Sequence, residues 1–285
     1  MTPQIASNQA SKSGSLLSFF LLTYAIAWIC FGAAALVAGD MGPSMPALSG
    51  LRWPFLIMGA FAPSGVALYL SARAEGKAGA DALIRRLFIW RVRPRWYLFA
   101  LAYMAAIKIA VALLFRVSMG TWPRFGDYPA WYLVILGSIV SGILGGPLGE
   151  ELGWRGYALP RMATRFGLVR ASVLLGVIWA LWHVPAFFLS GIDKYGQSLP
   201  LYVVQVTALS VAFAWLSLNT KGSLLLAVLL HTAINQSKDI VPSITEGAKN
   251  IFTLNVSVVG RLTVTLLWIC AAYFLFRMKN QRLMQ

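Results

Sequence analysis

The chain has 285 residues, of which 59% are apolar and 12% are charged. Soluble proteins average about 45–50% apolar and about 25% charged residues, so this composition excludes a soluble globular domain and a disordered chain. A net charge of +15 would indicate a nucleic-acid partner in a soluble protein. In a polytopic membrane protein the same charge marks cytoplasmic loops, so we expect the lipid bilayer and not nucleic acid as the surroundings of this chain.

Eight apolar stretches follow the polar residues 1–14. Most are close to the length of about 20 residues that a helix needs to cross the hydrocarbon core, and none alternates as a membrane-spanning strand does. We therefore predict an all-α polytopic membrane protein, a bundle of about eight transmembrane helices. The stretches cover residues 15–38, 53–72, 97–117, 131–151, 170–190, 200–218, 222–241 and 257–276.

The basic residues predict the orientation. If the amino terminus is inside, sixteen lysines and arginines lie in inside segments and six in outside segments. That asymmetry follows the positive-inside rule. We expect one transmembrane domain over 15–276 with cytoplasmic tails at 1–14 and 277–285, in the plasma membrane if the source is bacterial. The first span is longer than the ~7–15 apolar residues of a signal peptide, so we expect it to be retained.

Several other features favour structural roles. Residues 81–95 mix apolar side chains with five arginines, which fits either an interfacial helix on an anionic leaflet or a basic loop. Cys30 and Cys270 lie in apolar stretches and imply neither a disulfide nor a metal site. We also expect structural roles for the remaining charged residues in or near spans, Lys108, Arg261, Lys238 and Asp239.

Two adjacent acidic residues end the fourth stretch, in the segment Gly-Gly-Pro-Leu-Gly-Glu150-Glu151-Leu-Gly-Trp-Arg155-Gly. On a helix, Glu151 and Arg155 are four residues apart and share a face. Glu150 is rotated by about 100° to another face. Arg155 can therefore hold Glu151 while Glu150 stays available for chemistry. Ionisable residues within membrane spans usually mark functional sites, although a span end also tolerates charge as an anchor.

The only two histidines of the chain both lie within predicted spans. His183 follows Trp179 by one helical turn and precedes Pro185. His231 and Asn235 are four residues apart, so both side chains point into one site. Each of these groups could also serve as a structural hydrogen-bonding group between helices. Together with an unpaired Glu150, they predict one polar cavity in the second half of the chain.

At these three clusters the sequence resembles the CPBP family of intramembrane proteases, which includes CAAX-processing endopeptidases and bacterial Abi proteins. The family pattern is Glu-Glu-x-x-x-Arg, then Phe-x-x-x-His, then His-x-x-x-Asn/Asp. The first and third motifs match at Glu150-Glu151-x-x-x-Arg155 and His231-x-x-x-Asn235, and the second has Trp179 in place of Phe. The resemblance covers about residues 145–240.

The resemblance implies a glutamate-dependent intramembrane endopeptidase without a cofactor. Glu150 and His183 would bind and activate a water, and His231 and Asn235 would stabilise the oxyanion. Glu151 and Arg155 would form a supporting ion pair. The substrate would be a peptide or a prenylated protein, cleaved in CAAX-type processing or a related reaction. Because Glu150 is expected near the cytoplasmic end of its span, we also expect a cavity that opens on the cytoplasmic side.

Two alternatives remain from the residues alone. Glu150, His183 and His231 could bind zinc with one open position, as in a membrane metalloprotease. The chain could also be a non-enzymatic immunity or scaffold protein that keeps the fold. A repeat-based transporter is disfavoured because the polar motifs lie only in the second half.

Overall fold

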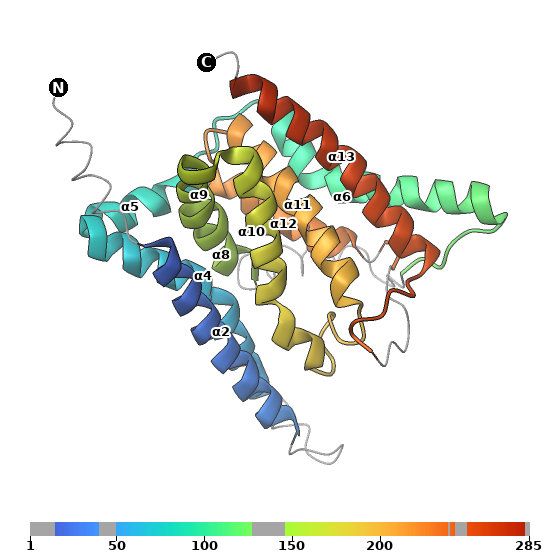
Figure 1. Ribbon diagram of the computed structural model, residues 1–285, viewed down its shortest axis with the longest axis horizontal. Helices are drawn as coiled ribbons and strands as arrows, with labels where there is room; N and C mark the ends of the chain where they lie inside the picture. Colours follow the sequence, from blue (N-terminus) through green and yellow to red (C-terminus); the bar gives the residue numbers. More distant parts are fainter. Residues whose placement is uncertain (1–14, 40–49, 127–145, 239, 243–249, 283–285) are drawn as a thin grey trace.

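The structure is a computed structural model that describes residues 15–39, 50–126, 146–238, 240–242 and 250–282 (Figure 1). All regular secondary structure in these residues is helical, which confirms the predicted fold class. The elements are α2 (Leu16–Gly39), α4 (Arg52–Glu75), α5 (Lys77–Arg85), η1 (Arg86–Phe88), α6 (Pro94–Met119), α8 (Gly146–Glu151), η2 (Leu152–Ala158), α9 (Leu159–Phe166), α10 (Leu168–Trp182), η3 (Val184–Phe188), α11 (Leu199–Asn219), α12 (Leu224–Ser237) and α13 (Val258–Arg282).

Six helical segments are long and apolar enough to cross a membrane, and each coincides with a predicted span. The predicted span at 131–151 lies mostly outside the described residues, which contain only its end. The final helix α13 continues through Arg282, beyond the start predicted for the carboxyl-terminal tail. The six segments are Leu16–Val37, Arg52–Glu75, Pro94–Met119, Leu168–Phe188, Leu199–Asn219 and Val258–Asn280.

The predicted span at 222–241 is wrong in length. Helix α12 has 14 residues, which at 1.5 Å per residue is about 21 Å, short of the ~30 Å hydrocarbon core. It begins after a tight turn in which Lys221 and Gly222 both have positive φ, and Ser223 caps it by accepting from the Leu226 amide. A short helix suffices here because α12 packs against α6, α8 and α11 within the bundle.

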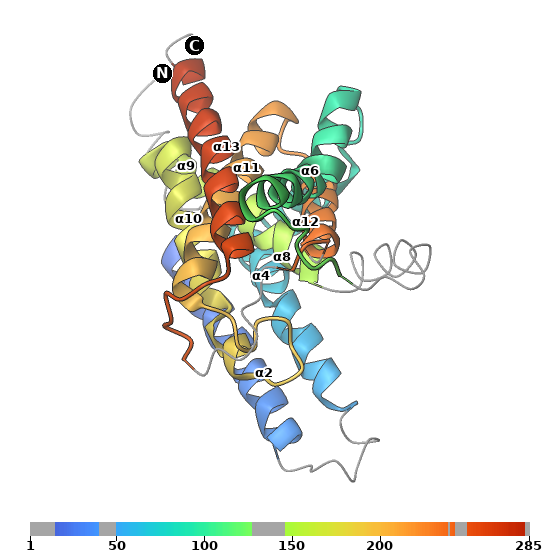
Figure 2. The ribbon, with the colours of Figure 1, turned by 90° about the vertical axis from the view of Figure 1, so that its right-hand side faces the viewer.

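The two ends of the bundle differ in charge. The carboxyl end of α4, helices α5 and α9, and the end of α13 lie at the top of Figures 1 and 2, where the predicted inside arginines and lysines gather. The paired helices α2 and α4 extend to the opposite end, together with the loop between η3 and α11. We call these the basic end and the distal end. Residues 81–95 belong to the basic end, where Phe88 and Trp90 are exposed.

A buried lysine on α6 joins three segments of the bundle through hydrogen bonds. Lys108 on α6 is 1% exposed, and its Nζ donates to the Val241 carbonyl at 2.9 Å and to Thr263 Oγ1 at 3.4 Å. These bonds join α6 to the segment after α12 and to α13. Lys108 is therefore a structural residue, as expected from the sequence.

Glycines allow α8 and η2 to lie directly against α4. A Cβ added at Gly149 would lie 2.7 Å from the Ala60 carbonyl oxygen, and one at Gly153 would lie 2.5 Å from the Pro63 Cβ. Both distances are shorter than van der Waals contact, so only glycine fits at this approach. The close packing fixes the position of Glu150 and Glu151, which lie between the two glycines.

We expect Gly153→Ala to destabilise the protein, because the added methyl group collides with the α4 backbone. Overpacking of this kind costs about 1–3 kcal/mol, which thermal unfolding in detergent will register as a lower Tm. Gly65→Ala on α4 is the matched control, since the space around Gly65 is open and alanine favours a helix. Equal Tm values for the two variants would contradict the close packing.

Candidate functional site

The two acidic residues lie where an α-helix passes into a π-helix. Helix α8 ends at Glu151, and η2 continues it with the wider i→i+5 hydrogen bonding before α9 begins. Single π-helical turns are rare and occur frequently at functional sites. Every residue of η2 is buried, and Glu150 and Glu151 are 5% and 0% exposed. Both carboxyl groups therefore need partners within the protein.

Glu151 binds two side chains with one oxygen. Its Oε1 accepts from Arg155 Nη1 at 3.0 Å and lies 2.7 Å from Nδ1 of His231 on α12. The ion pair with Arg155 confirms the i, i+4 geometry predicted from the sequence. The contact with His231 joins residues 80 positions apart and was not predicted. Because a carboxylate can only accept, Nδ1 of His231 carries the proton in this contact. The other ring nitrogen, Nε2, does not contact Glu151.

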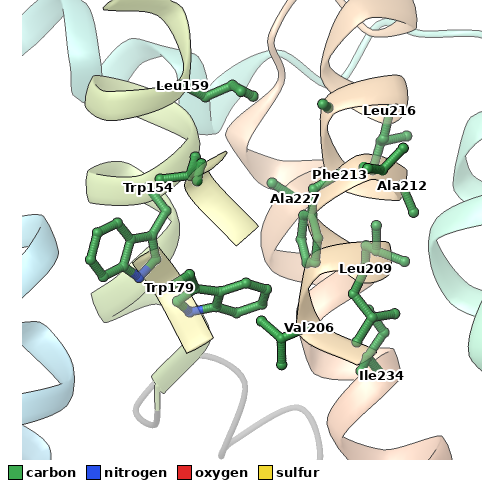
Figure 3. Packing of buried hydrophobic residues seen from close by; sticks show 14 of the residues in the cluster. Trp154, Leu159, Trp179, Val206, Leu209, Ala212, Phe213, Leu216, Ala227 and Ile234 are labelled. Carbon is green, nitrogen blue, oxygen red and sulfur yellow. The ribbon is translucent and has the colours of Figure 1, made fainter. Parts of the chain in front are cut away.

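Aromatic rings enclose the Arg155 guanidinium. Its central carbon lies 3.9 Å from the ring centroids of both Trp179 on α10 and Phe213 on α11. Such cation–π contacts gain strength when the cation is removed from water. Figure 3 shows Trp179 projecting from α10 towards α11, beside Phe213 and Val206. Arg155 thus connects η2 to α10 and α11 as well as neutralising Glu151.

Glu150 is held by the one residue that departs from the family pattern. The indole Nε1 of Trp179 donates to Glu150 Oε2 at 2.6 Å. Phenylalanine at this position could fill the same space but could not donate. Trp179 also packs edge-to-face on His231, with ring centroids 5.4 Å apart. The departure from the pattern therefore adds a polar contact to the site.

His183 lies at the end of α10, where the chain turns into the short 3₁₀ helix η3. Its Nδ1 is 2.9 Å from the Trp179 carbonyl oxygen. A carbonyl can only accept, so Nδ1 carries the proton and Nε2 has a lone pair in the neutral ring. Trp182 and Tyr202 pack edge-to-face against the imidazole, at centroid distances of 4.7 Å and 5.4 Å. The ring is therefore fixed in both orientation and tautomer.

The four predicted catalytic residues line one cavity. Glu150, His183, His231 and Asn235 all contribute to the wall of a cavity of about 330 Å³. The sequence prediction that these motifs converge is thus consistent with the geometry. Asn235 follows His231 by one turn of α12, and both side chains border the cavity as their spacing predicted.

The cavity reaches the distal end of the bundle. Its rim includes Trp53 at the start of α4, the loop residues Asp193 and Lys194, and Lys238 after α12. The cavity therefore opens away from the basic end, and the expected opening on the cytoplasmic side stays a prediction that depends on the orientation in the membrane. The chain runs from Glu150 through the fully buried η2 to reach α9, so η2 separates the carboxylate from the basic end. The structural role expected for Lys238 also needs extension, because this residue borders the cavity.

Arg86 supports η2 from the basic end. Its guanidinium donates to the carbonyl oxygens of Gly156 at 2.7 Å, Gly222 at 3.0 Å and Arg155 at 3.3 Å. These bonds satisfy backbone groups of η2 and of the turn before α12. Burial and the neighbouring Arg161 lower the pKa of Arg86. Part of the basic segment at 81–95 is therefore packed into the protein behind the site, while its exposed aromatic residues face outwards.

The zinc alternative is not favoured by this arrangement. In the ranges that the structure describes, no three histidine, cysteine, aspartate or glutamate side chains are grouped closely enough to hold a metal ion. Of the proposed ligands Glu150, His183 and His231, each already makes a short polar contact within the protein.

Comparison with known proteins agrees with the three motifs. Residues 127–237 match the family model described as type II CAAX prenyl endopeptidase Rce1-like. The chain is 25% identical over 253 residues to a Methanococcus maripaludis protein named CAAX prenyl protease 2, across 82% of this chain and 88% of that protein. The chain is thus similar to Rce1-like CAAX prenyl endopeptidases. These matches and the apolar helices support an intramembrane endopeptidase.

The Rce1-like family match covers the residues of all three motifs, from Glu150 to Asn235. Two interactions in this chain could not be predicted from the motifs. The contact between Glu151 and His231 joins the first motif to the third. The hydrogen bond from Trp179 to Glu150 joins the second motif to the first. The Phe-to-Trp departure was the only signal in the sequence that pointed to either.

Trp179→Phe tests the added polar contact. The variant keeps the aromatic ring beside Arg155 but removes the donor to Glu150. We expect a loss of about tenfold in kcat, equivalent to about 1.4 kcal/mol, because the carboxylate is less firmly oriented. Peptide cleavage by purified protein will measure it. Unchanged kcat in Trp179→Phe, with Trp90→Phe as the exposed control, would show that the indole donor has no role.

Proposed function

We propose that this Rce1-like protein hydrolyses a peptide bond in its membrane-embedded cavity, with Glu150 as the general base. The different surroundings of the two adjacent carboxylates support this proposal. Glu151 is fully buried and is bound by Arg155 and His231. Glu150 borders the cavity and, among the described residues, accepts a hydrogen bond from the Trp179 indole. A base must reach the reacting water, and Glu150 is the carboxylate placed to do so.

The reaction follows from the groups on the cavity wall. Glu150 removes a proton from a water whose other hydrogen is donated to Nε2 of His183, and the water oxygen attacks the peptide carbonyl carbon. The oxyanion that forms accepts from the Asn235 amide and from His231 when its Nε2 carries a proton. The C–N bond then breaks, and the proton held by Glu150 passes to the amine leaving group. Atoms and charge balance without a cofactor.

The substrate class follows from the environment of the cavity. A cavity among membrane-spanning helices selects peptides that are anchored in the bilayer by a lipid or an apolar segment. The Methanococcus maripaludis relative is named for CAAX prenyl proteins, in which the prenylated cysteine is followed by three residues at the chain end. We infer that a prenylated peptide of this kind is a substrate of the present chain.

Cleavage of a farnesylated CAAX peptide by purified protein in detergent tests the proposal. We expect Glu150→Gln to abolish cleavage, and Asn235→Ala to lower kcat by roughly 10²–10³, as for loss of an oxyanion donor. Glu75→Gln is the matched control, because Glu75 is exposed at the end of α4. A chelator should leave the wild-type rate unchanged. Full activity of Glu150→Gln would reject this glutamate as the base, and chelator-sensitive cleavage would restore the zinc alternative.

We further propose that both termini are cytoplasmic, on the strength of the sixteen-to-six distribution of basic residues. The basic end of the bundle then faces the cytoplasm. The rim at Trp53, Asp193 and Lys238 belongs to the distal end, so the cavity opens on the non-cytoplasmic side. A peptide client would present its cleaved segment from that side of the membrane.

Cysteine labelling tests this orientation. Tyr195 is 56% exposed in the distal loop, and Lys279 is exposed at the basic end of α13. In a background that lacks Cys30 and Cys270, a membrane-impermeant maleimide should label Tyr195→Cys in intact cells and Lys279→Cys only in inverted vesicles. The reverse pattern would place the cavity mouth in the cytoplasm, where cytoplasmic prenylated proteins could reach it directly.

A further inference from the structure

Two lysines stand at the cavity mouth around a single described carboxylate. Nζ of Lys194 and Nζ of Lys238 each lie 2.7 Å from Oδ2 of Asp193. Lys194 also lies over the Tyr202 ring, 5.4 Å from its centroid. All four residues border the same cavity as Glu150. Asp193 thus bridges the two ammonium groups at the cavity mouth.

The lysine side chains are partly withdrawn from water. Their exposed fractions are 15% for Lys194 and 27% for Lys238, against 40% for Asp193. Burial acts to raise the pKa of Asp193, but the two ammonium groups outweigh it and lower that pKa well below its usual range. Asp193 therefore stays ionised and holds both lysines in place. Its position shows that one carboxylate oxygen can bridge the two ammonium groups.

Helix α12 connects this cluster to the catalytic centre. His231, Ile234, Asn235 and Lys238 follow one another at helical spacing, and all four line the cavity. Lys238 is seven residues after His231, so the two lie about 10 Å apart along the helix axis at 1.5 Å per residue. An extended peptide covers that distance in about three residues, at 3.3–3.6 Å each.

We propose that Lys238 and Lys194 bind the free carboxylate at the end of the substrate, three residues beyond the scissile bond. The inference rests on the proposed function, because it assumes that cleavage occurs beside Glu150 and His231. With the scissile carbonyl at that point, a peptide extended along α12 brings its terminal carboxylate to the two ammonium groups. Charge-assisted hydrogen bonds of this kind are stronger than neutral ones. The distance between the catalytic residues and the two lysines thus sets the length of the released peptide.

This arrangement makes the enzyme selective for chain ends. A substrate that ends in an amide has no negative charge for the lysines to bind. A substrate with additional residues after the scissile bond has its carboxylate beyond the reach of Lys238. Internal peptide bonds of a folded membrane protein are excluded for the same reason. The length of three residues equals the segment that follows cysteine in a C-a-a-X terminus.

The test compares two farnesylated peptides that differ only in a free-acid or carboxamide terminus. We expect wild-type protein to prefer the acid by about tenfold in kcat/KM, equivalent to about 1.4 kcal/mol, mostly through KM. Lys238→Gln and Lys194→Gln should bring the acid-to-amide ratio towards one, through a loss of cleavage of the acid. Lys238→Arg should restore the preference. Lys279→Gln, an exposed lysine at the basic end, is the matched control.

The ratio within each variant separates recognition from stability, because a misfolded variant would lose both activities alike. A wild-type ratio near one would overturn the proposal, as would a preference that survives in both lysine variants. Peptides with four or five residues beyond the scissile bond provide a second test, and equal cleavage of these longer peptides would also overturn it. Absence of cleavage of either peptide by wild-type protein would instead reject the proposed function.

Discussion

The structure of the site depends on the buried carboxylate of Glu151. A fully buried charge needs a partner of opposite charge. Loss of one partner from a buried pair typically lowers the stability of the folded protein by about 3–5 kcal/mol. Here Arg155 supplies the countercharge and His231 a second contact, so the carboxylate joins the end of α8 to η2 and to α12. Arg155 in turn lies between Trp179 and Phe213, which extends the same connection to α10 and α11. Glu151 and Arg155 together thus connect five elements, α8, η2, α10, α11 and α12.

That arrangement explains why a second acidic residue can remain at the cavity. If Arg155 were shared equally between adjacent carboxylates, neither would be available as a base. The helical rotation between Glu150 and Glu151 points them in different directions, and Glu151 occupies the guanidinium. Trp179 then holds Glu150 through a single hydrogen bond, which orients the carboxylate without supplying a full charge. The adjacent glycines keep this segment against α4, so the orientation is set by packing as well as by charge.

The sequence predicted those parts of the fold and the site that depend on local periodicity. The spacing of Glu151 and Arg155 predicted their ion pair, and that of His231 and Asn235 predicted a shared face. Apolar length predicted six of the spans. The bond between Glu151 and His231 was beyond this reasoning, because nothing local specifies contacts across 80 residues. The short α12 was missed because hydropathy does not distinguish a helix buried among other helices from one that meets lipid at both ends.

The end of the bundle at which the cavity opens depends on packing that the sequence does not specify locally. The position of Glu150 near the end of its predicted span led us to expect an opening at that same end. In three dimensions η2 and α9 fill that end, and Arg86 binds the backbone carbonyls that the π-helix presents there. The same π-helix that positions the carboxylates therefore separates them from the basic loops. Asp193, Lys194 and Lys238 border the same cavity as Glu150 at the distal end. In the proposed mechanism, a substrate that enters from this end meets these charged residues before it meets Glu150. The proposed selectivity for a chain end and the access to the catalytic water would then arise from one feature of the fold.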